Sequence, residues 1–410
     1  MATPKLRFKE FDGDWLSAPL KKYFPKIRNG FVGVATPYYV DKGVKYLQGK
    51  NVKDGKIDPA GLIYISEEFH LKKNNSKLSI DDILMVQSGH VGECAVIETE
   101  YDNANCHALI VLSPHQEQKT NSHFVKYYFY TPLGKKIISQ VKTGNTIEHV
   151  LASEIKEVEL NFPSKAEQTK IASFLSAVDE KISQLTQKHA LLSQYKQGMM
   201  QKLFSQQLRF KADDGSEFGE WRNKKVIDLF VEIKDKVLNQ DIETYSITAG
   251  KGFVSQAEKF GRDISGQQNS NYIVLKPQDF SYNKGNSKTY KYGCVYLNEF
   301  DYSIAVPNVF ISFRAKNINE VNQKFYAKLF EYHYLDKHLR LLISSSARMD
   351  GLLNVSKDGF FEINVPYPCL EEQTKIANFL SSIDQKIEVV AQQIEHAKQW
   401  KKGLLQQMFV

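Results

Sequence analysis

The sequence has few cysteines and no long apolar run. The cysteines lie far apart among 410 residues, and no two of them form a Cys-x-x-Cys pair; they are Cys94, Cys106, Cys294 and Cys369. Such spacing is typical of reduced thiols rather than of a disulfide framework. No apolar segment approaches the ~20 residues of a membrane span, and residues 1–9 contain no apolar stretch of a secretion signal. We therefore expect a cytoplasmic protein without a membrane partner.

Motifs for enzymatic chemistry are also missing. An adenine methylase would carry an Asn/Asp-Pro-Pro-Tyr/Phe loop, but the run 364–367 has Val365 in place of the first proline, and we interpret it as a strand. The nearest carboxylate and lysine set of a magnesium-dependent nuclease, Glu232 with Lys234, lies on no strand pattern. Histidines and cysteines match no zinc-finger spacing, even in their densest group: His90, Cys94, Cys106 and His107. We expect no catalytic residue, no metal and no cofactor in this chain.

Composition points to an ordinary globular protein of more than one domain. Hydrophobic residues make up 42% of the sequence and charged residues 25%. The length leaves room for two or three domains with cores of their own. A net charge of +7 permits a polyanionic partner, but the charges are interspersed and form no basic tail. Any nucleic-acid surface must therefore be created by folding.

The most informative feature is an internal repeat. The run Glu167–Ile182 returns almost unchanged as Glu372–Ile387, 205 positions later (372 − 167), which is half of the 410 residues. Both copies predict long helices, and Ser164 with Glu167 predicts a capping box at the start of the first helix.

Apolar residues recur along both copies at alternating steps of four and three. In the first copy this row, here called the seam, contains Ile171, Leu175, Val178, Ile182, Leu185, Leu192, Met199 and Leu203. In the second it contains Ile376, Leu380, Ile383, Ile387, Val390, Ile394, Ala397, Leu404 and Met408. The heptad pattern favours two helices that pack against each other over the alternative that each helix is a core element of its own domain. Lys196 and Lys401 interrupt the seam at matching positions, His189 adds another polar site, and such residues usually fix the register.

The repeat extends beyond the helices. Leu6–Lys9 returns as Leu208–Lys211, and Trp15 returns as Trp221. The strand-like run before each helix also repeats, with 158–163 matching 363–368. We therefore expect two units in series: a globular domain at 1–162, a spacer helix at 163–207, a globular domain at 208–367 and a spacer helix at 368–410.

The globular domains predict a mixed α/β (α+β) fold class, and between them they share almost no sequence. Each combines short strands with one expected helix. The strands are Ile83–Val86, Ala108–Leu112, Tyr272–Leu275 and Asn308–Phe313, and the helices are Ser122–Val141 and Ala327–Ile343. Two packed helices would relate the domains by an internal pseudo-two-fold axis. Two-fold-related readers suit B-DNA, whose equivalent grooves recur every ~34 Å.

The repeated Glu-Gln-x-Lys-Ile-Ala-x-Phe-Leu run resembles the specificity (S) subunit of type I restriction–modification systems. The Leu-Arg-Phe and Gly-Asp/Glu-Trp openings of both halves add to the resemblance, which covers the whole chain. It implies that each globular domain is a target-recognition domain that reads one half of a bipartite, asymmetric DNA site. It also implies that the helices form an antiparallel coiled coil, which sets the unread gap.

The resemblance further implies a non-catalytic subunit that works with partners. Two methyltransferase (M) subunits would form an adenine methylase with S-adenosylmethionine, and two restriction (R) subunits would add ATP- and magnesium-dependent cleavage. Those cofactors are expected in the partner subunits. An alternative from another class is a coiled-coil adaptor that binds only proteins. Sequence-selective, salt-dependent DNA binding by the assembled complex would exclude the adaptor.

Polar and basic loops are the candidates for reading DNA. Base edges are recognised by Arg, Lys, Asn, Gln, Ser and Thr, while lysines also hold phosphates. The candidates in the first domain are Gln48, Lys50, Asn51, Lys53, Gln87, Ser88, His90, Lys142, Thr143 and Asn145. Those in the second domain are Lys251, Gln267, Asn269, Lys284, Asn286, Lys288, Tyr290 and Arg348. For each one, the alternative is a solvated loop without a ligand.

Overall fold

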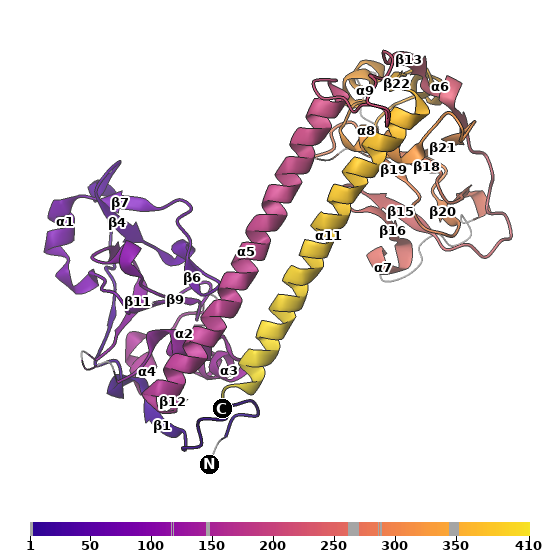
Figure 1. Ribbon diagram of the computed structural model, residues 1–410. Coiled ribbons are helices and arrows are strands. Elements are labelled where there is room, and N and C mark those ends of the chain that lie inside the picture. The colour runs from indigo at the N-terminus through magenta and orange to yellow at the C-terminus, as the bar shows by residue number, and fades with distance from the viewer. Residues whose placement is uncertain are drawn as a thin grey trace. The chain divides into compact units, whose positions relative to one another are not determined.

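Two compact units make up the computed structural model, and each is described by itself. The structure describes residues 3–115, 117, 119–144, 148–260, 270–285, 287, 289–343 and 352–410. The first unit comprises Met1–Gln187 with Ala391–Val410, and the second comprises Lys188–Val390. Two long helices, α5 (Lys165–Phe204) and α11 (Leu370–Gln407), contribute residues to both units (Figure 1).

The two long helices pack on each other through the predicted seam. In the first unit, Ile171 and Leu175 near the start of α5 share a core with Leu404 and Met408 near the end of α11. In the second unit the relation is reversed, because the end of α5 packs with the start of α11. That core contains Met200, Leu203, Ile376 and Leu380. The helices are therefore antiparallel, which confirms the predicted paired spacers.

Each lysine that interrupts the seam pairs with an aspartate of the other helix. Lys401 Nζ lies 2.6 Å from Asp179 Oδ1 in the first unit, and Lys196 Nζ lies 2.5 Å from Asp384 Oδ1 in the second. The two aspartates occupy matching repeat positions, as the two lysines do. Sliding one helix along the other would separate both pairs, so they favour a single register.

The first unit is built on a four-stranded antiparallel sheet in the order β2-β11-β8-β9. Its strands are β1 (Leu16–Pro19), β2 (Lys26–Asn29), β3 (Tyr39–Val40), β4 (Val44–Leu47), β5 (Val52–Lys53), β6 (Lys56–Ile57), β7 (Ile63–Ile65), β8 (Ile83–Val86), β9 (Cys94–Val96), β10 (Asn105–Cys106), β11 (Leu109–Ser113) and β12 (Glu159–Phe162). Its short helices are α1 (Glu67–Lys72), α2 (Ser122–Tyr130), α3 (Pro132–Gln140) and α4 (Ala152–Glu157).

Alternating side chains of β8 enter two different cores. Ile83 and Met85 pack with α2 and the long helices. Leu84 and Val86 pack on the opposite face, beneath the smaller sheet β10-β4-β7-β3 and the β5–β6 hairpin. The period of two along a strand produces this division, and it explains why β8 is apolar throughout.

The second unit repeats this scaffold with the order β14-β21-β18-β19. Its strands are β13 (Arg222–Lys225), β14 (Phe230–Glu232), β15 (Tyr245–Thr248), β16 (Gly252–Ser255), β17 (Ile273–Leu275), β18 (Phe280–Asn283), β19 (Cys294–Leu297), β20 (Ile304–Val306), β21 (Ile311–Ala315) and β22 (Asn364–Tyr367). Its short helices are α6 (Val226–Leu229), α7 (Gln256–Phe260), α8 (Gln323–Glu331), α9 (Asp336–Leu342) and α10 (Lys357–Phe361). The β13–β22 pair repeats the β1–β12 pair, and the run 364–367 is a strand, as interpreted from sequence. Both units mix helices with antiparallel sheets, which confirms the predicted fold class.

The expectation of one helix over 122–141 and one over 327–343 is wrong. The first region contains α2 and α3, which are separated at Thr131-Pro132. Pro132 has no amide to continue α2, and Thr131 Oγ1 accepts a bond from the Gly134 amide to cap α3. In the second region, α8 begins at Gln323 and is separated from α9 by His333, whose φ of 61° is incompatible with a right-handed helix.

A buried carboxylate anchors the first turn of each long helix. Glu167 accepts hydrogen bonds from Nε and Nη2 of Arg7, both at 2.7 Å, and from Trp15 Nε1 at 3.4 Å. Glu372 accepts the equivalent bonds from Arg209 at 3.0 and 2.9 Å and from Trp221 at 2.9 Å. The predicted capping box is thus half correct. Ser164 Oγ accepts the amide of Glu167, but the Glu167 carboxylate turns to Arg7 and Trp15.

The glutamine that follows each anchor binds the neighbouring backbone. Gln168 Oε1 accepts the Asn121 amide at 3.0 Å, just before α2, while its Nε2 donates to the Pro163 carbonyl. Gln373 Oε1 accepts the Asn322 amide at 2.8 Å, just before α8, while its Nε2 donates to the Pro368 carbonyl. The repeated Glu-Gln pair therefore joins three segments in each unit: the opening segment, the long helix and the helical layer of the sheet.

None of the helices among the described residues is both long enough and apolar enough to cross a membrane.

Glu167→Gln should lower the free energy of unfolding by about 2–3 kcal/mol, because Arg7 loses the carboxylate of a largely buried pair. Chemical denaturation of the purified chain, followed by circular dichroism, measures this loss. Glu180→Gln, at an exposed position on the same helix, is the matched control and should change little. Equal stability of the two variants would contradict the anchoring role.

Lys126 is a buried lysine that the scaffold does not require. Only 6% of it is exposed, and burial lowers the pKa of its ammonium to about 8. The helices α2 and α8 start after the equivalent caps Asn121 and Asn322, and this alignment places Ala327 where α2 has Lys126. Below pH ~8 the folded state must bury a charge that the unfolded chain keeps in water, so folding loses free energy there.

Lys126→Met should therefore raise the free energy of unfolding by about 1–3 kcal/mol at pH 7. The gain should shrink between pH 8 and about 10.5, where the lysine becomes neutral in both states. Denaturant titrations at pH 7 and pH 10 measure the difference. Lys328→Met is the control, because Lys328 pairs with Asp384 and Glu331 and its loss should destabilise. A destabilised Lys126→Met variant at pH 7 would refute the argument.

Candidate nucleic-acid interface

Two of the candidate turns in the first unit lie against each other. The turn after β8 contains Gln87 and Ser88, and the Gln87 carbonyl accepts the Val150 amide at 3.0 Å. The turn after α3 contains Thr143, whose backbone exchanges two hydrogen bonds of 2.9 Å with His149. Ser88 also forms a backbone bridge with His149, so both turns meet at this residue. Exposed Ser88, Thr143 and His149 thus form one polar surface.

Other candidates in these turns have distinct surroundings. His90 is exposed beyond Gly89, whose φ of 80° suits glycine in a tight turn. Lys142 pairs with the exposed Glu148 at 2.8 Å, so its ammonium is already partly neutralised.

A lysine-bearing hairpin lies next to these turns. Lys53 of β5 and Lys56 of β6 are exposed and directly opposite each other. The turn residues Asp54 and Gly55 both have positive φ, 51° and 81°, as a type I′ turn requires. The Asp54 amide donates to Glu93 Oε2 and the Gly55 amide donates to Tyr130 Oη, at 2.9 and 2.8 Å. The hairpin is therefore held firmly and presents two positive charges to solvent.

The turn before this hairpin contains the other three candidates. Lys50 is exposed, and Gln48 is half-buried with its Nε2 bonded to Tyr39 Oη at 3.1 Å. Asn51 is fully buried, and its amide nitrogen donates to the carbonyls of Asp58 and Ala60. Asn51 therefore shapes the turn, and its side chain does not reach solvent.

The second unit holds its candidate loop by an equivalent backbone link. The carbonyl of Lys284, just after β18, accepts the Leu353 amide at 2.9 Å, as Gln87 after β8 accepts Val150. Asn283 connects this loop to the β15–β16 hairpin, because its Nδ2 donates to the Ile247 carbonyl at 3.1 Å. Exposed Lys251 occupies the tip of that hairpin. In the first unit the loop after β8 lies next to the β5–β6 hairpin, and in the second unit the loop after β18 lies next to the β15–β16 hairpin. The exposed side chains of these loops and hairpins differ between the units.

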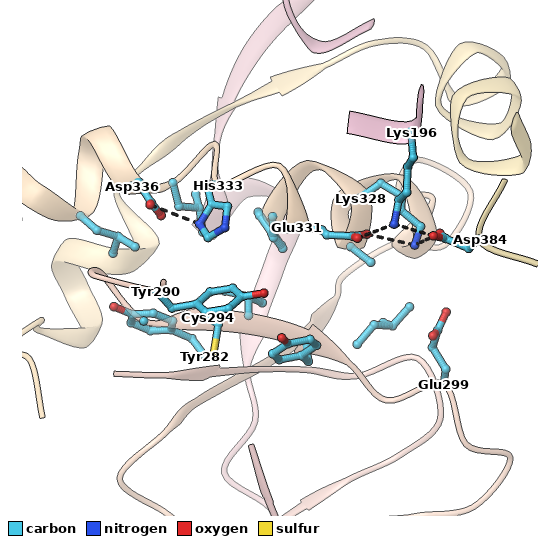
Figure 2. A pocket seen from close by; sticks show the side chains of 18 residues that line it. Lys196, Tyr282, Tyr290, Cys294, Glu299, Lys328, Glu331, His333, Asp336 and Asp384 are labelled. Atoms are coloured by element: carbon cyan, nitrogen blue, oxygen red, sulfur yellow. Dashed lines mark hydrogen bonds and ion pairs between the residues drawn. The ribbon is translucent and has the colours of Figure 1, made fainter. Parts of the chain in front are cut away.

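Tyr290 lies in the wall of a pocket of about 230 Å³ in the second unit (Figure 2). Its ring contacts that of His333 at a centroid distance of 5.0 Å. Across the pocket, Lys196 and Lys328 pair with Asp384 and Glu331. Because these charges are already paired and Tyr290 is half-buried, the pocket wall is mainly a structural junction between α8 and the long helices.

Six candidates lie outside the described residues: Asn145, Gln267, Asn269, Asn286, Lys288 and Arg348. Two exposed residues of the surface, Lys56 and His149, were missed at the level of sequence. The Asp54-Gly55 dipeptide was the available signal for Lys56, because Asp-Gly between two short strands predicts a hairpin with paired flanks. No sequence signal identifies His149, whose role comes from its pairing with two separate turns.

Metal chemistry finds no geometric support in the part of the chain that the structure describes. There, no group of three or more His, Cys, Asp or Glu side chains could hold a metal ion. The surfaces offer hydroxyl, amide, imidazole and ammonium groups instead, which are suited to binding a polyanion.

The duplicated scaffold with different exposed loops defines a two-domain recognition protein. The family described as type I restriction modification DNA specificity domain matches the chain twice, at residues 22–194 and 219–399. The chain belongs to this family and is a type I restriction–modification specificity subunit. Sequence reasoning had indicated the same family from the repeated Glu-Gln run, and this is confirmed.

Similar proteins extend over nearly the whole chain. The specificity subunits of the type I restriction enzymes MjaX and MjaVIII from Methanocaldococcus jannaschii are 23% and 25% identical to it. They cover 98% and 97% of this chain, and the match spans 94% of each relative. The crystal structure of a type I restriction–modification S subunit from M. genitalium matches with a TM-score of 0.62 and 18% identity, covering 100% of this chain and 99% of that one. That structural match supports the fold.

Lys53→Ala should weaken DNA binding by the assembled complex to a similar extent on all sequences. A lysine that contacts a phosphate contributes no base information, and its loss should reduce the salt slope of log affinity by about 1. Fluorescence anisotropy across a salt series measures both quantities. Lys72→Ala, which removes a lysine paired with Glu68 on α1, is the control. Loss of affinity for one sequence alone would show that Lys53 reads a base instead.

Proposed function

We propose that this chain is the non-catalytic subunit that gives a type I restriction–modification complex its DNA sequence specificity. Each unit reads one half of a bipartite, asymmetric site. The observation that carries the proposal is the repetition of one scaffold with different loops at the same place. Gln87 and Lys284 follow equivalent strands and make the same backbone link, yet their side chains differ.

Different side chains on one scaffold suit two different half-sites. In the first unit the joined turns present Ser88, Thr143 and His149, and the neighbouring hairpin adds two lysines. The second unit presents exposed Lys251 from its hairpin, and its loop carries Lys284, which is half-buried with its ammonium 3.4 Å from the Val355 carbonyl. Hydroxyl, imidazole and ammonium groups bond to different base edges in the major groove, so one duplex geometry can be read as two sequences.

The long helices set the unread gap between the half-sites. Their register is supported by the pairs Lys401–Asp179 and Lys196–Asp384. The complex contains two methyltransferase subunits and two restriction subunits. Those partners bind S-adenosylmethionine, ATP and magnesium, and this chain supplies recognition and a platform.

Deleting the gene from its host should remove one split adenine-methylation motif, two short halves around a fixed gap. Methylated-base sequencing of the genome measures this directly. Restoring the wild-type gene should restore the motif. Restoring Ser88→Ala with Thr143→Ala should relax one half only, because each base contact contributes about 1–3 kcal/mol. Lys251→Ala is the matched change in the second unit and should leave that first half intact.

Methylation of an unchanged motif in the deleted strain, with the methyltransferase subunit present, would contradict the proposed function. A restored strain in which both halves relax together would contradict the assignment of one half-site to each unit. Binding of protein partners without any sequence-selective DNA binding would favour the adaptor function.

A further inference from the structure

Each unit holds the tip of its lysine-bearing hairpin with the hydroxyl of one tyrosine. In the first unit, the Gly55 amide in the β5–β6 turn donates to Tyr130 Oη at 2.8 Å. In the second unit, the Gly250 amide in the β15–β16 turn donates to Tyr296 Oη at 2.9 Å. Both glycines have a positive φ, 81° and 80°, so each tyrosine binds the residue at which the chain turns.

Tyr130 is the last residue of α2, and the second unit has no tyrosine at the equivalent position. Its hydroxyl donates to Glu93 Oε2 at 2.8 Å, which leaves the oxygen to accept the amide of the turn. The caps Asn121 and Asn322 align α2 with α8, which places Glu331 where α2 has Tyr130 (130 − 121 and 331 − 322 both give 9). Glu331 pairs with two lysines instead, so the tyrosine of the second unit comes from another part of the scaffold.

Tyr296 lies on β19, and the first unit has an alanine at the equivalent position. The equivalent backbone links just after β8 and β18 align Leu84 with Ser281. Ala95 pairs with Leu84, and Tyr296 pairs with Ser281. Two different positions of one repeated scaffold thus carry a tyrosine for the same contact. Duplication of the scaffold does not explain this agreement, so each hairpin has its own requirement for a fixed tip.

Both hairpins need support from outside their own strands. The β5–β6 and β15–β16 sheets are two-stranded, and an isolated two-stranded hairpin is marginally stable in water. The exposed lysines on these hairpins are Lys53, Lys56 and Lys251. Lysine binds a phosphate as a flexible point charge, so the backbone beneath it must supply the position. A tip that moves must be ordered during binding, and this ordering costs affinity.

We propose that Tyr130 and Tyr296 are positioning residues for DNA binding. Each hydroxyl fixes the hairpin tip of its own unit, so that the lysines of that hairpin meet the phosphates of one half-site without further ordering. The proposal rests on the proposed function, because it requires each unit to bind DNA. Neither tyrosine touches the DNA, and each controls affinity through the lysines above it.

A double-mutant cycle tests whether a tyrosine acts through the lysines of its own hairpin. Fluorescence anisotropy measures the affinity of the assembled complex for a duplex that carries both half-sites. Tyr130→Phe should weaken binding about two- to ten-fold, the effect of one lost hydrogen bond. In a chain that already carries Lys53→Ala and Lys56→Ala, Tyr130→Phe should add almost no further loss, because it acts through those lysines.

The second unit supplies a matched cycle and a cross-control. Tyr296→Phe should add almost no loss to that of Lys251→Ala. Tyr130→Phe combined with Lys251→Ala should instead be additive, because the two sites lie in different units. Tyr326→Phe removes a hydroxyl that donates to the Pro366 carbonyl, away from either hairpin, and it should leave DNA affinity unchanged.

Hydrogen-exchange mass spectrometry of the unbound full-length chain reports on the tip directly. Tyr130→Phe should speed exchange in the peptide that contains residues 53–56 and leave the strands of the main sheet unchanged. Glu93→Ala removes the carboxylate that accepts the Asp54 amide, so it frees the same tip by another route. It takes the place of Tyr130→Phe in the cycle if that variant fails to fold.

Two results would overturn the positioning role and leave the proposed function standing. One is a full additional loss from Tyr130→Phe in the chain that carries Lys53→Ala and Lys56→Ala, which would assign the hydroxyl a general structural role. The other is unchanged DNA affinity for both tyrosine variants. A wild-type complex without sequence-selective DNA binding would instead overturn the proposed function itself.

Discussion

The buried carboxylate at the start of each long helix is the constraint on which the rest of each unit depends. Glu167 and Glu372 are almost entirely inaccessible to solvent, so each must be compensated where it lies. Arg7 and Arg209 supply that compensation from segments that are remote in sequence. The next residue, Gln168 or Gln373, accepts a backbone amide just before α2 or α8. A single turn of the long helix therefore holds together the opening segment, the long helix and the helices that cover the sheet. Loops can then diverge at the far end of the sheet without disturbing this junction.

Much of the scaffold could be predicted because its signals are local or repeated. The seam follows from apolar spacing within each helix, and the duplication shows that one solution was used twice. The partners of Glu167 could not be predicted, because Arg7 lies 160 residues away and no periodicity connects them. Pro132 is a local signal for the end of a helix, but the amphipathic pattern that continues through residues 122–141 led to the prediction of one unbroken helix. His333 gave only a weak warning, since histidine is enriched among the non-glycine residues with positive φ but adopts it rarely.

Prediction of the candidate DNA-binding surface was limited in the same way, because local sequence does not show distant contacts. Polar turns could be identified from composition, but composition does not show which side chains form hydrogen bonds within the turn itself. Asn51 looks like a reader of bases and is used to close its own turn. Ser88 and Thr143 looked like separate candidates, yet His149 brings them into one surface. The Asn51 result depends on the local fold of its own turn, and the Ser88–His149 bridge depends on the meeting of two separate turns. Neither arrangement can be read from residue composition.

The repeat also explains how two equivalent units arise from one chain. In the second unit the chain runs without a break from Phe204 to Arg209, and the Leu208 amide donates to the Lys202 carbonyl at 3.1 Å. In the first unit the Leu6 amide donates to the Gln407 carbonyl at 2.9 Å, although these residues come from opposite parts of the sequence. Phe409 packs on Phe124 there, as Phe204 packs on Phe325. Contacts thus replace a covalent connection, and both buried anchors meet the same surroundings. Equivalent anchoring therefore leaves the loops of each unit free to differ from those of the other.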